Sequence, residues 1–359
     1  MEGSANLALV LSGTLIVGLL SLLAQGGRKN RVAEILLLFA IASLSLLVVA
    51  LGMLVGLLGP SSAPDLPPEL FASSAIVLVL TGLAGAAICV PPLLKIFGRR
   101  ATTSQSATPP ISEGSESADG PEIRASGALW SDPPIYFALW MLVVVLASNV
   151  VAFLAFALVP DAVGNTLTSA GRISPETLAL GQLPFLVVAL CGVGLGVRRN
   201  LREVLARLGY GPLTLPQLGI VALFIVGALL LSFAADTLFA TLQPDLYEQV
   251  GEVSDGLFSP EGLSPISAIL FALLIGVGAG VGEETLFRGA VQPALGITLT
   301  SILFASMHVQ YGPSLLLGYL FILSVGLGLL RRHVNTTASF AAHASYNASG
   351  VLLAYFFGV

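Results

Sequence analysis

Long apolar stretches alternate with short polar breaks over most of the 359 residues of this chain. A membrane-spanning helix needs about 20 mostly apolar residues. By this measure the candidate spans are 6–25, 32–58, 71–98, 134–159, 181–197, 217–235, 265–292, 297–311, 313–331 and 337–357. The pattern therefore predicts an all-α fold, a polytopic transmembrane helix bundle of about ten spans.

One segment departs from this pattern. Residues 101–133 are rich in Ser, Thr, Pro and Gly with scattered acidic residues, and they hold too little apolar surface to build a core. We therefore expect three parts: a three-span amino-terminal membrane unit at 1–100, a flexible cytoplasmic linker at 101–133, and a seven-span membrane unit at 134–359.

Charged residues make up only 10% of the chain, against about 25% in soluble domains. The basic residues gather on alternate loops, whereas the loops at 59–70 and 236–261 hold acidic residues and no Lys or Arg. Because basic loops stay in the cytoplasm, this asymmetry places the amino terminus outside. We expect an integral membrane protein of a bacterial plasma membrane, with the lipid bilayer as its surroundings. The net charge of −5 argues against nucleic acid as a partner.

A few ionisable or strongly polar residues interrupt the apolar stretches near the carboxy terminus. Such groups at membrane depth are costly, so they usually face the bundle interior or an aqueous cavity and mark function. They are Glu283, Glu284, Arg288, His308, His343 and Asn347. These residues are our candidates for the functional site.

Helix geometry separates the two neighbouring glutamates. Glu284 and Arg288 stand at i and i+4 in the order that favours an ion pair, while Glu283 points about 100° away. The chain is expected to turn near Gly296, with Glu283 thirteen residues before it and His308 twelve after. At 1.5 Å per residue both lie roughly 18–20 Å from the turn, so they should be level in the bundle. Glu283 is thus the candidate general base.

The same residue types suit hydrolysis by an activated water. A carboxylate and an imidazole can share the activation of the water, and further donors can stabilise an oxyanion. In this interpretation His308 assists Glu283, and His343 and Asn347 provide the donors. The alternatives are a proton-coupled membrane transporter, with Glu283 and the histidines as a relay, and a non-catalytic membrane scaffold. The sequence has no evident internal repeat, which speaks against a transporter built from duplicated halves.

Three segments have, in this order, the forms E-E-x-x-x-R, F-x-x-x-H and H-x-x-x-N/D: 283–288, 304–308 and 343–347. They resemble the signature motifs of the CAAX-prenyl-protease and bacteriocin-processing family of intramembrane proteases. The resemblance covers about 264–357. It implies a glutamate-dependent endopeptidase of the CAAX-protease type, with an active site toward the cytoplasm and a peptide or lipidated protein as substrate.

At the matching positions, the resemblance gives water activation to Glu283 and His308 and the oxyanion to His343 and Asn347. Glu284 and Arg288 would support the site. Members of the family are commonly classed as metalloproteases, so a divalent metal such as zinc stays an open expectation. Its ligands would be Glu283, His308 and His343, although the chain has no His-Glu-x-x-His zinc motif.

Overall fold

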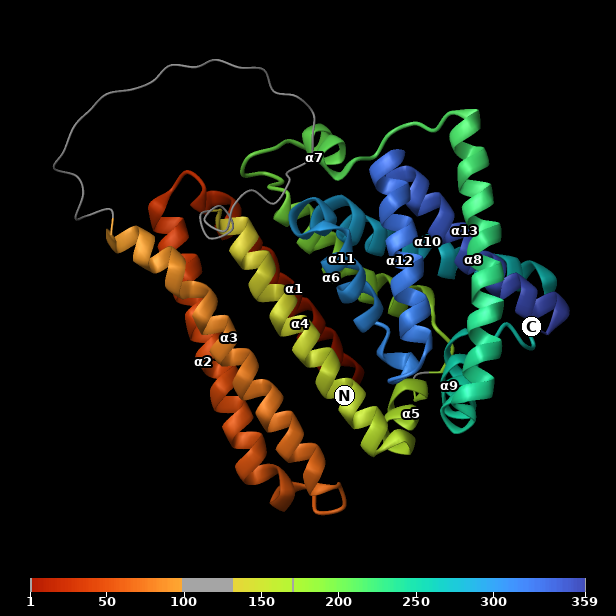
Figure 1. Cartoon of the computed structure of the whole chain (residues 1–359), viewed down its shortest axis with the longest axis horizontal. Coiled ribbons are helices and arrows are strands. Elements are labelled where there is room, and N and C mark those ends of the chain that lie inside the picture. Colours follow the sequence, from red (N-terminus) through yellow and green to blue (C-terminus); the bar gives the residue numbers. More distant parts are fainter. Residues whose placement is uncertain (1, 99–131, 170, 359) are drawn as a thin grey trace.

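The computed structural model describes residues 2–98, 132–169 and 171–358 (Figure 1). These residues are almost entirely helical and include no β-strand, which confirms the all-α prediction. The linker predicted for 101–133 lies outside the described residues, except for its last two positions. Of these, Asp132 precedes the first helix of the second unit and Pro133 begins it.

The long helices follow one another along the chain. They are α1 (Glu2–Gly27), α2 (Arg31–Ser62), α3 (Pro68–Gly98), α4 (Pro133–Leu158), α6 (Pro175–Gly192), α8 (Leu215–Leu242), α10 (Pro265–Glu284), α11 (Gln292–Ser306), α12 (Leu316–His333) and α13 (Thr336–Phe357). Shorter elements connect them: α5 (Pro160–Thr168), α7 (Leu201–Leu208), α9 (Pro244–Phe258), the π-helical η2 (Thr285–Val291) and the 3-10 turn η3 (Val309–Tyr311).

Within the described residues, eight helical stretches are long and apolar enough to cross a membrane, rather than about ten. Two features explain the difference. Residues Pro265–Ser306 form one apolar stretch of 42 residues, because α10, η2 and α11 follow without a break in sequence. The chain nevertheless reverses within it at Gly296, whose φ of 80° and ψ of 172° are accessible to glycine alone. The turn predicted near Gly296 is therefore confirmed. Helix α13 is long enough, but its Thr, Ser, His and Asn residues lower its apolar character.

The amino-terminal helices pack on the second unit. Helices α2 and α3 lie side by side, α3 and α1 contact α4, and α1 also contacts α6 (Figure 1). Leu37, Leu38 and Ile41 of α2 share a buried cluster with Trp140 of α4. The indole of Trp140 donates a hydrogen bond to Ser45 Oγ at 3.0 Å. The contact is specific as well as apolar, because the indole N–H has a partner.

Helix α10 is packed closely on two sides through two sets of glycines. Gly276 and Gly280 face α13, where a Cβ at Gly276 would collide with the backbone carbonyl of Ala344. Gly278 and Gly282 face α6, where a Cβ would collide with Leu178 and Gln182, respectively. Small residues four apart let helices approach closely within a membrane. The glycine-rich run therefore lets α10 contact both neighbours at short range.

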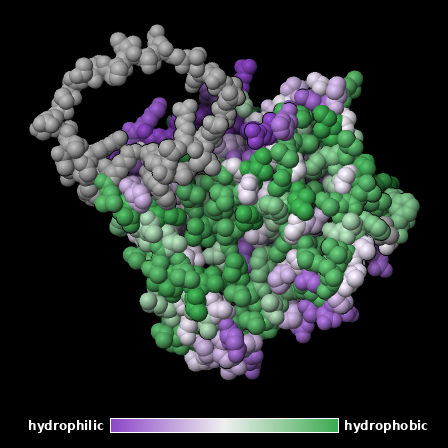
Figure 2. All heavy atoms as spheres, in the orientation of Figure 1, coloured by the Kyte–Doolittle hydropathy of each residue, from purple (hydrophilic) through white to green (hydrophobic). Residues whose placement is uncertain are grey.

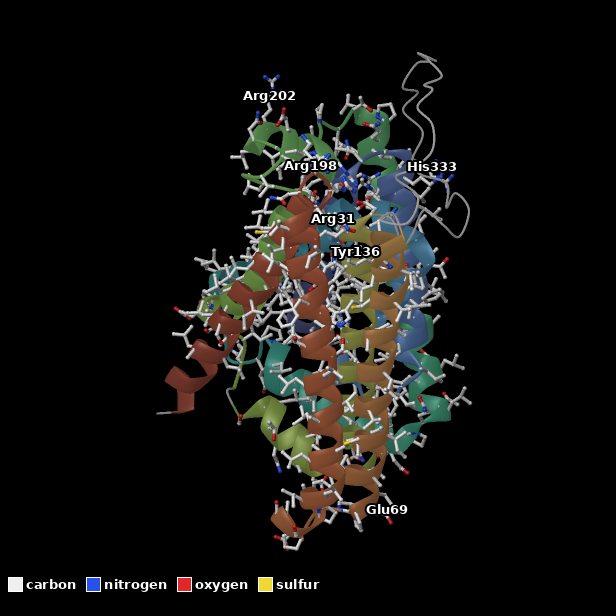
Figure 3. The ribbon with its side chains drawn as sticks, turned by 90° about the vertical axis from the view of Figure 1, so that its left-hand side faces the viewer. Arg31, Glu69, Tyr136, Arg198, Arg202 and His333 are labelled. Atoms are coloured by element: carbon white, nitrogen blue, oxygen red, sulfur yellow. The ribbon has the colours of Figure 1, made fainter. Side chains whose placement is uncertain are left out.

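The two ends of the bundle carry opposite charge. Figure 3 shows Arg31, Arg198, Arg202 and His333 at one end and Glu69 at the other. On the face drawn in Figure 2, apolar residues fill the broad middle and hydrophilic residues gather toward the ends. A broad apolar belt between polar ends suits a protein that crosses a bilayer. The described basic clusters thus share one side, as the sequence predicts. We call it the basic end.

Candidate active site

The polar residues of the predicted site begin where α10 ends. Glu283 and Glu284 occupy its last turn, and the chain then continues as the wider π-helical segment η2, which contains Arg288. Such π-helical insertions are rare and frequently occur at functional sites. Glu284 is fully buried, whereas 14% of the Glu283 side chain is exposed. Adjacent carboxylates therefore occupy different environments, because successive helical residues point about 100° apart.

A buried charged cluster surrounds Glu284. Its Oε2 lies 3.3 Å from Arg288 Nε, so the expected i,i+4 ion pair is present and neither side chain is exposed. The guanidinium of Arg288 also donates from Nη2 to Ser324 Oγ at 3.1 Å. It lies over the Phe304 ring, with Cζ 5.1 Å from the ring centre. Because charged groups are stable inside a bundle only when they are paired, these contacts explain how both can be buried.

His343 completes this cluster from α13. Its Nδ1 lies 2.9 Å from Glu284 Oε1. A carboxylate paired with a guanidinium accepts hydrogen bonds, so the imidazole donates from Nδ1 and its ring orientation is fixed. Its other nitrogen, Nε2, lies 4.0 Å from Glu283 Oε2. His343 therefore connects the buried carboxylate to the partly exposed one.

His308 approaches from the other side, just beyond the end of α11. Its Nδ1 lies 2.9 Å from the carbonyl oxygen of Phe304. A carbonyl can only accept, so Nδ1 carries the proton and Nε2 of the neutral ring keeps a free lone pair. The imidazole stacks on Tyr311, with centroids 6.1 Å apart and planes 5° apart. The lone pair on Nε2 is what a base or a water-binding group requires.

Phe304 lies among these polar groups. Its ring centroid is 4.8 Å from that of His308 and 5.8 Å from that of His343. The same ring lies under the guanidinium of Arg288. The aromatic position of the F-x-x-x-H motif is thus explained by packing, because one ring supports three functional side chains.

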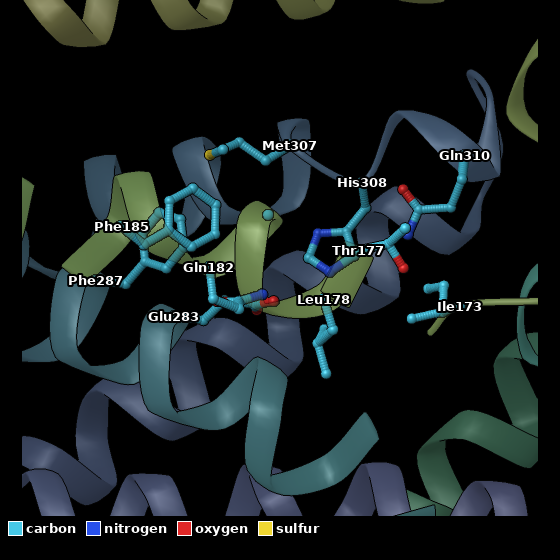
Figure 4. A pocket seen from close by; sticks show the side chains of 11 residues that line it. Ile173, Thr177, Leu178, Gln182, Phe185, Glu283, Phe287, Met307, His308 and Gln310 are labelled. Atoms are coloured by element: carbon cyan, nitrogen blue, oxygen red, sulfur yellow. The ribbon is translucent and has the colours of Figure 1, made fainter. Parts of the chain in front are cut away.

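Glu283 and His308 line one cavity of about 280 Å³ (Figure 4). Most of the other lining side chains are apolar or uncharged: Ile173, Thr177, Leu178, Gln182, Phe185, Phe287, Met307 and Gln310. Helix α6 forms one wall of the cavity, and the segment around His308 forms another (Figure 4). An apolar pocket with a few convergent polar groups is typical of a binding or active site.

His343 and Asn347 are not among the described residues that line this cavity. His343 is buried, with Nε2 4.0 Å from Glu283 Oε2, and Asn347 lies one helical turn further along α13, partly buried. The structure therefore brings Glu283, Glu284, Arg288, His308 and His343 together. Asn347, within the described part of the chain, has no hydrogen bond or ion pair with any of them, so its role stays a prediction.

The comparison with known families bears on this region. Residues 265–349, from the start of α10 into α13, match the family model described as type II CAAX prenyl endopeptidase Rce1-like. All three sequence motifs lie inside the match. The similarity is confined to residues 265–349, and we call this segment the Rce1-like domain on that ground. No curated protein and no solved structure matches the chain.

The arrangement in the Rce1-like domain does not gather a metal-ligand set. Among the described residues, no group of three His, Cys, Asp or Glu side chains is placed to hold a metal ion. Both histidines of the predicted set direct Nδ1 to an oxygen of the protein, and His343 Nε2 is still 4.0 Å from Glu283. Zinc–nitrogen bonds are about 2.0–2.1 Å long. In this arrangement the residues do not fit a metal ion.

Two residues of the site were not predicted from the sequence, one outside the Rce1-like domain and one inside it. Gln182 of α6 lines the cavity, and its side chain lies against Gly282, next to Glu283. Ser324 of α12 accepts a hydrogen bond from Arg288. Each is a polar residue within an apolar stretch of helix, and this is the feature of the sequence that could have indicated a role in the site. Without knowledge of which helices touch, however, neither could be assigned to the site.

Tyr210, outside the spans, fixes the start of η2 from the basic end. Burial raises the pKa of its phenol above the usual range, so the group stays neutral and can donate. The hydroxyl of Thr285 donates to the carbonyl of Val281 and accepts from Tyr210, with the two hydroxyl oxygens 2.6 Å apart. The residue that follows Glu284 is therefore held in place on both sides.

Proposed function

We propose that this protein is an intramembrane endopeptidase that hydrolyses peptide bonds of a membrane-associated or lipidated peptide or protein. One observation carries the proposal. Within an Rce1-like domain of a membrane helix bundle, Glu283 and His308 line the same cavity, and the Nδ1 bond of His308 leaves Nε2 of the neutral ring unprotonated. A carboxylate and a neutral imidazole facing one space can hold and deprotonate a water between them.

In the proposed reaction, Glu283 takes a proton from that water while His308 Nε2 accepts its second hydrogen bond. The water oxygen bonds to the carbonyl carbon, and the carbonyl electron pair moves to the oxygen. When the tetrahedral intermediate collapses, the C–N bond breaks. Glu283 returns its proton to the departing amine, so that the carboxylate is regenerated.

The buried cluster holds the base in position in this proposal. Glu284 accepts from His343 Nδ1, and His343 directs Nε2 toward Glu283 Oε2. Arg288 balances the charge of Glu284. The resemblance assigns His343 and Asn347 to the oxyanion, and we retain that role for them as part of the proposal; His343 fills it in its doubly protonated form, in which Nε2 also carries a hydrogen.

We further propose that the basic end faces the cytoplasm and that the active site lies toward that side. The guanidinium of Arg331, at the basic end of α12, donates to the backbone carbonyl of Arg288 at 3.0 Å. The hydroxyl of Thr336, seven residues before His343, donates to the carbonyl of Leu208 in α7. Both contacts support a site within the half of the bundle that carries the basic residues.

The experiment is an assay of the purified protein in lipid nanodiscs against a quenched-fluorescence peptide library that includes carboxy-terminally prenylated members. We expect cleavage by the wild type and a loss of at least about 10²-fold in Glu283→Gln, the lower range for a general base. Glu252→Gln is the matched control, because Glu252 is exposed on α9. Undiminished cleavage by Glu283→Gln would overturn the proposal.

A further inference from the structure

The polar side chains of the cavity are not all accounted for by the proposed reaction. Glu283 and His308 have their roles, and the Thr177 hydroxyl bonds within the first turn of α6, donating to the carbonyl of Ser174 at 3.0 Å. Gln310 lies in the short turn η3 after His308. Gln182 stands on the wall formed by α6, and its Oε1 is buried without a hydrogen-bond partner among the described residues.

Close helix packing fixes the position of Gln182. A Cβ added to Gly282 would lie 2.9 Å from Cδ and 3.0 Å from Cβ of Gln182, and would also collide with its Oε1. The amide of Gln182 thus lies directly over the Gly282 backbone, one residue from Glu283. Packing therefore holds the amide in the cavity wall, beside the candidate base.

The chemistry of the group indicates what it would bind. A primary amide has one acceptor oxygen and two N–H donors, so it can pair simultaneously with an N–H and a C=O group. A peptide backbone presents just these two groups. A buried acceptor without a partner needs an explanation in a folded protein, and a functional role is one of the recognised explanations.

We propose that Gln182 binds the backbone of the peptide substrate. Its Nε2 donates to a substrate carbonyl, and its Oε1, which lies against Gly282 in the free protein, turns to accept from a substrate N–H. The peptide bond to be cleaved is thereby held against Glu283 and His308. The inference rests on the proposed function and adds to it a substrate-binding residue from α6, outside the Rce1-like domain.

The main test compares Gln182→Met with wild type, because methionine has a similar volume and cannot make either hydrogen bond. We expect kcat/KM to fall about 10- to 100-fold, the scale of misplaced reactants. The thermal midpoint should stay level or rise, since an unpaired buried acceptor is removed. Leu190→Met, on α6 but away from the cavity, is the control and should change neither quantity. A lowered midpoint with normal kcat/KM would overturn the proposal in favour of helix packing.

Two further variants give signals that a packing role would not. In Gln182→Glu the side chain can donate only when protonated, so its activity relative to wild type should rise as the pH is lowered. In Gly282→Ala the added methyl group displaces the amide, so activity should fall, and Gln182→Met should add little to that loss. A flat pH ratio, or additive losses in the double variant, would overturn the assignment.

A measurement of peptide binding tests the role of Gln182 separately from the proposed hydrolysis. In the Glu283→Gln background, the anisotropy of fluorescent library peptides reports affinity without turnover. We expect Gln182→Met to weaken binding about tenfold there, roughly the loss of one to two hydrogen bonds. If the wild type binds the peptides but hydrolyses none of them, the endopeptidase function is wrong, while the binding role of Gln182 can still hold. If Gln182→Met binds the peptides as tightly as the protein that retains Gln182, and the wild type hydrolyses them normally, only the role of Gln182 is wrong.

Discussion

The buried cluster around Glu284 can be tested through protein stability, without knowledge of the substrate. In Glu284→Gln the amide oxygen can still accept from His343 Nδ1, so the shape and this hydrogen bond are retained. What changes is the charge beside Arg288. The guanidinium is fully buried 3.3 Å from the carboxylate, and its remaining partners, Ser324 and the Phe304 ring, are neutral.

The magnitude follows from this geometry. Removing one partner of a buried ion pair destabilises by about 3–5 kcal/mol, because the other charge stays buried and unpaired. We expect the lower end, about 3 kcal/mol, since Ser324 continues to accept from Arg288 and the Phe304 ring still lies against the guanidinium. For a unit of 150–250 residues, this corresponds to a fall in thermal midpoint of about 6–12 °C.

The assay is helix loss followed by circular dichroism in nanodiscs, with the exposed-site variant Glu252→Gln as control. The double variant Glu284→Gln/Arg288→Met removes both charges and should recover most of the loss, because the desolvated charge is gone. A midpoint of Glu284→Gln equal to that of wild type would show that Arg288 does not depend on Glu284. A double variant less stable than Glu284→Gln would refute the charge argument itself.

Three shorter predictions concern other parts of the site. His308→Ala should lose activity to the same extent as Glu283→Gln in the peptide assay, because each removes one of the two groups that hold the water. Asn347→Ala should lose about 10²–10³-fold in kcat if it donates to the oxyanion, and an unchanged kcat would remove it from the mechanism. Gly296→Ala should lower the thermal midpoint, since a side chain at a φ of 80° with this ψ costs about 1–3 kcal/mol. An unchanged midpoint would mean that the turn tolerates a side chain.

Local features of this chain were predictable from its sequence. The reversal at Gly296 and the Glu284–Arg288 pair both depend on residues a few positions apart, where helix geometry leaves little freedom. The different orientation of Glu283, about 100° from that of Glu284, follows from the same geometry. The all-α bundle follows from apolar length alone, although the number of spans does not, because α13 is long enough but not apolar enough.

Contacts between distant helices were not predictable in this way. The sequence places His343 with the oxyanion by its motif, whereas in the structure its Nδ1 donates to Glu284, 59 positions away. Gln182 reaches the site through α6, which precedes the motif region by about a hundred positions. One chain without aligned relatives contains no direct signal for such pairs, since periodicity reports which face of a helix is apolar and not which helix covers it.

The glycines of α10 explain why two adjacent glutamates can occupy different environments, one fully buried and one facing the cavity. Glu283, the proposed base, must reach the cavity, whereas the charge of Glu284, which supports it, is best kept away from water. Because Gly276 and Gly280 admit α13, His343 reaches Glu284 and encloses it. Because Gly278 and Gly282 admit α6, the wall opposite Glu283 is close enough to form a cavity rather than an open surface. Substitutions in the first pair should therefore disturb the buried charges and stability, and those in the second pair the cavity and its ligand. A helix that carries both carboxylates and packs closely against two neighbouring helices therefore needs glycine at these four alternate positions.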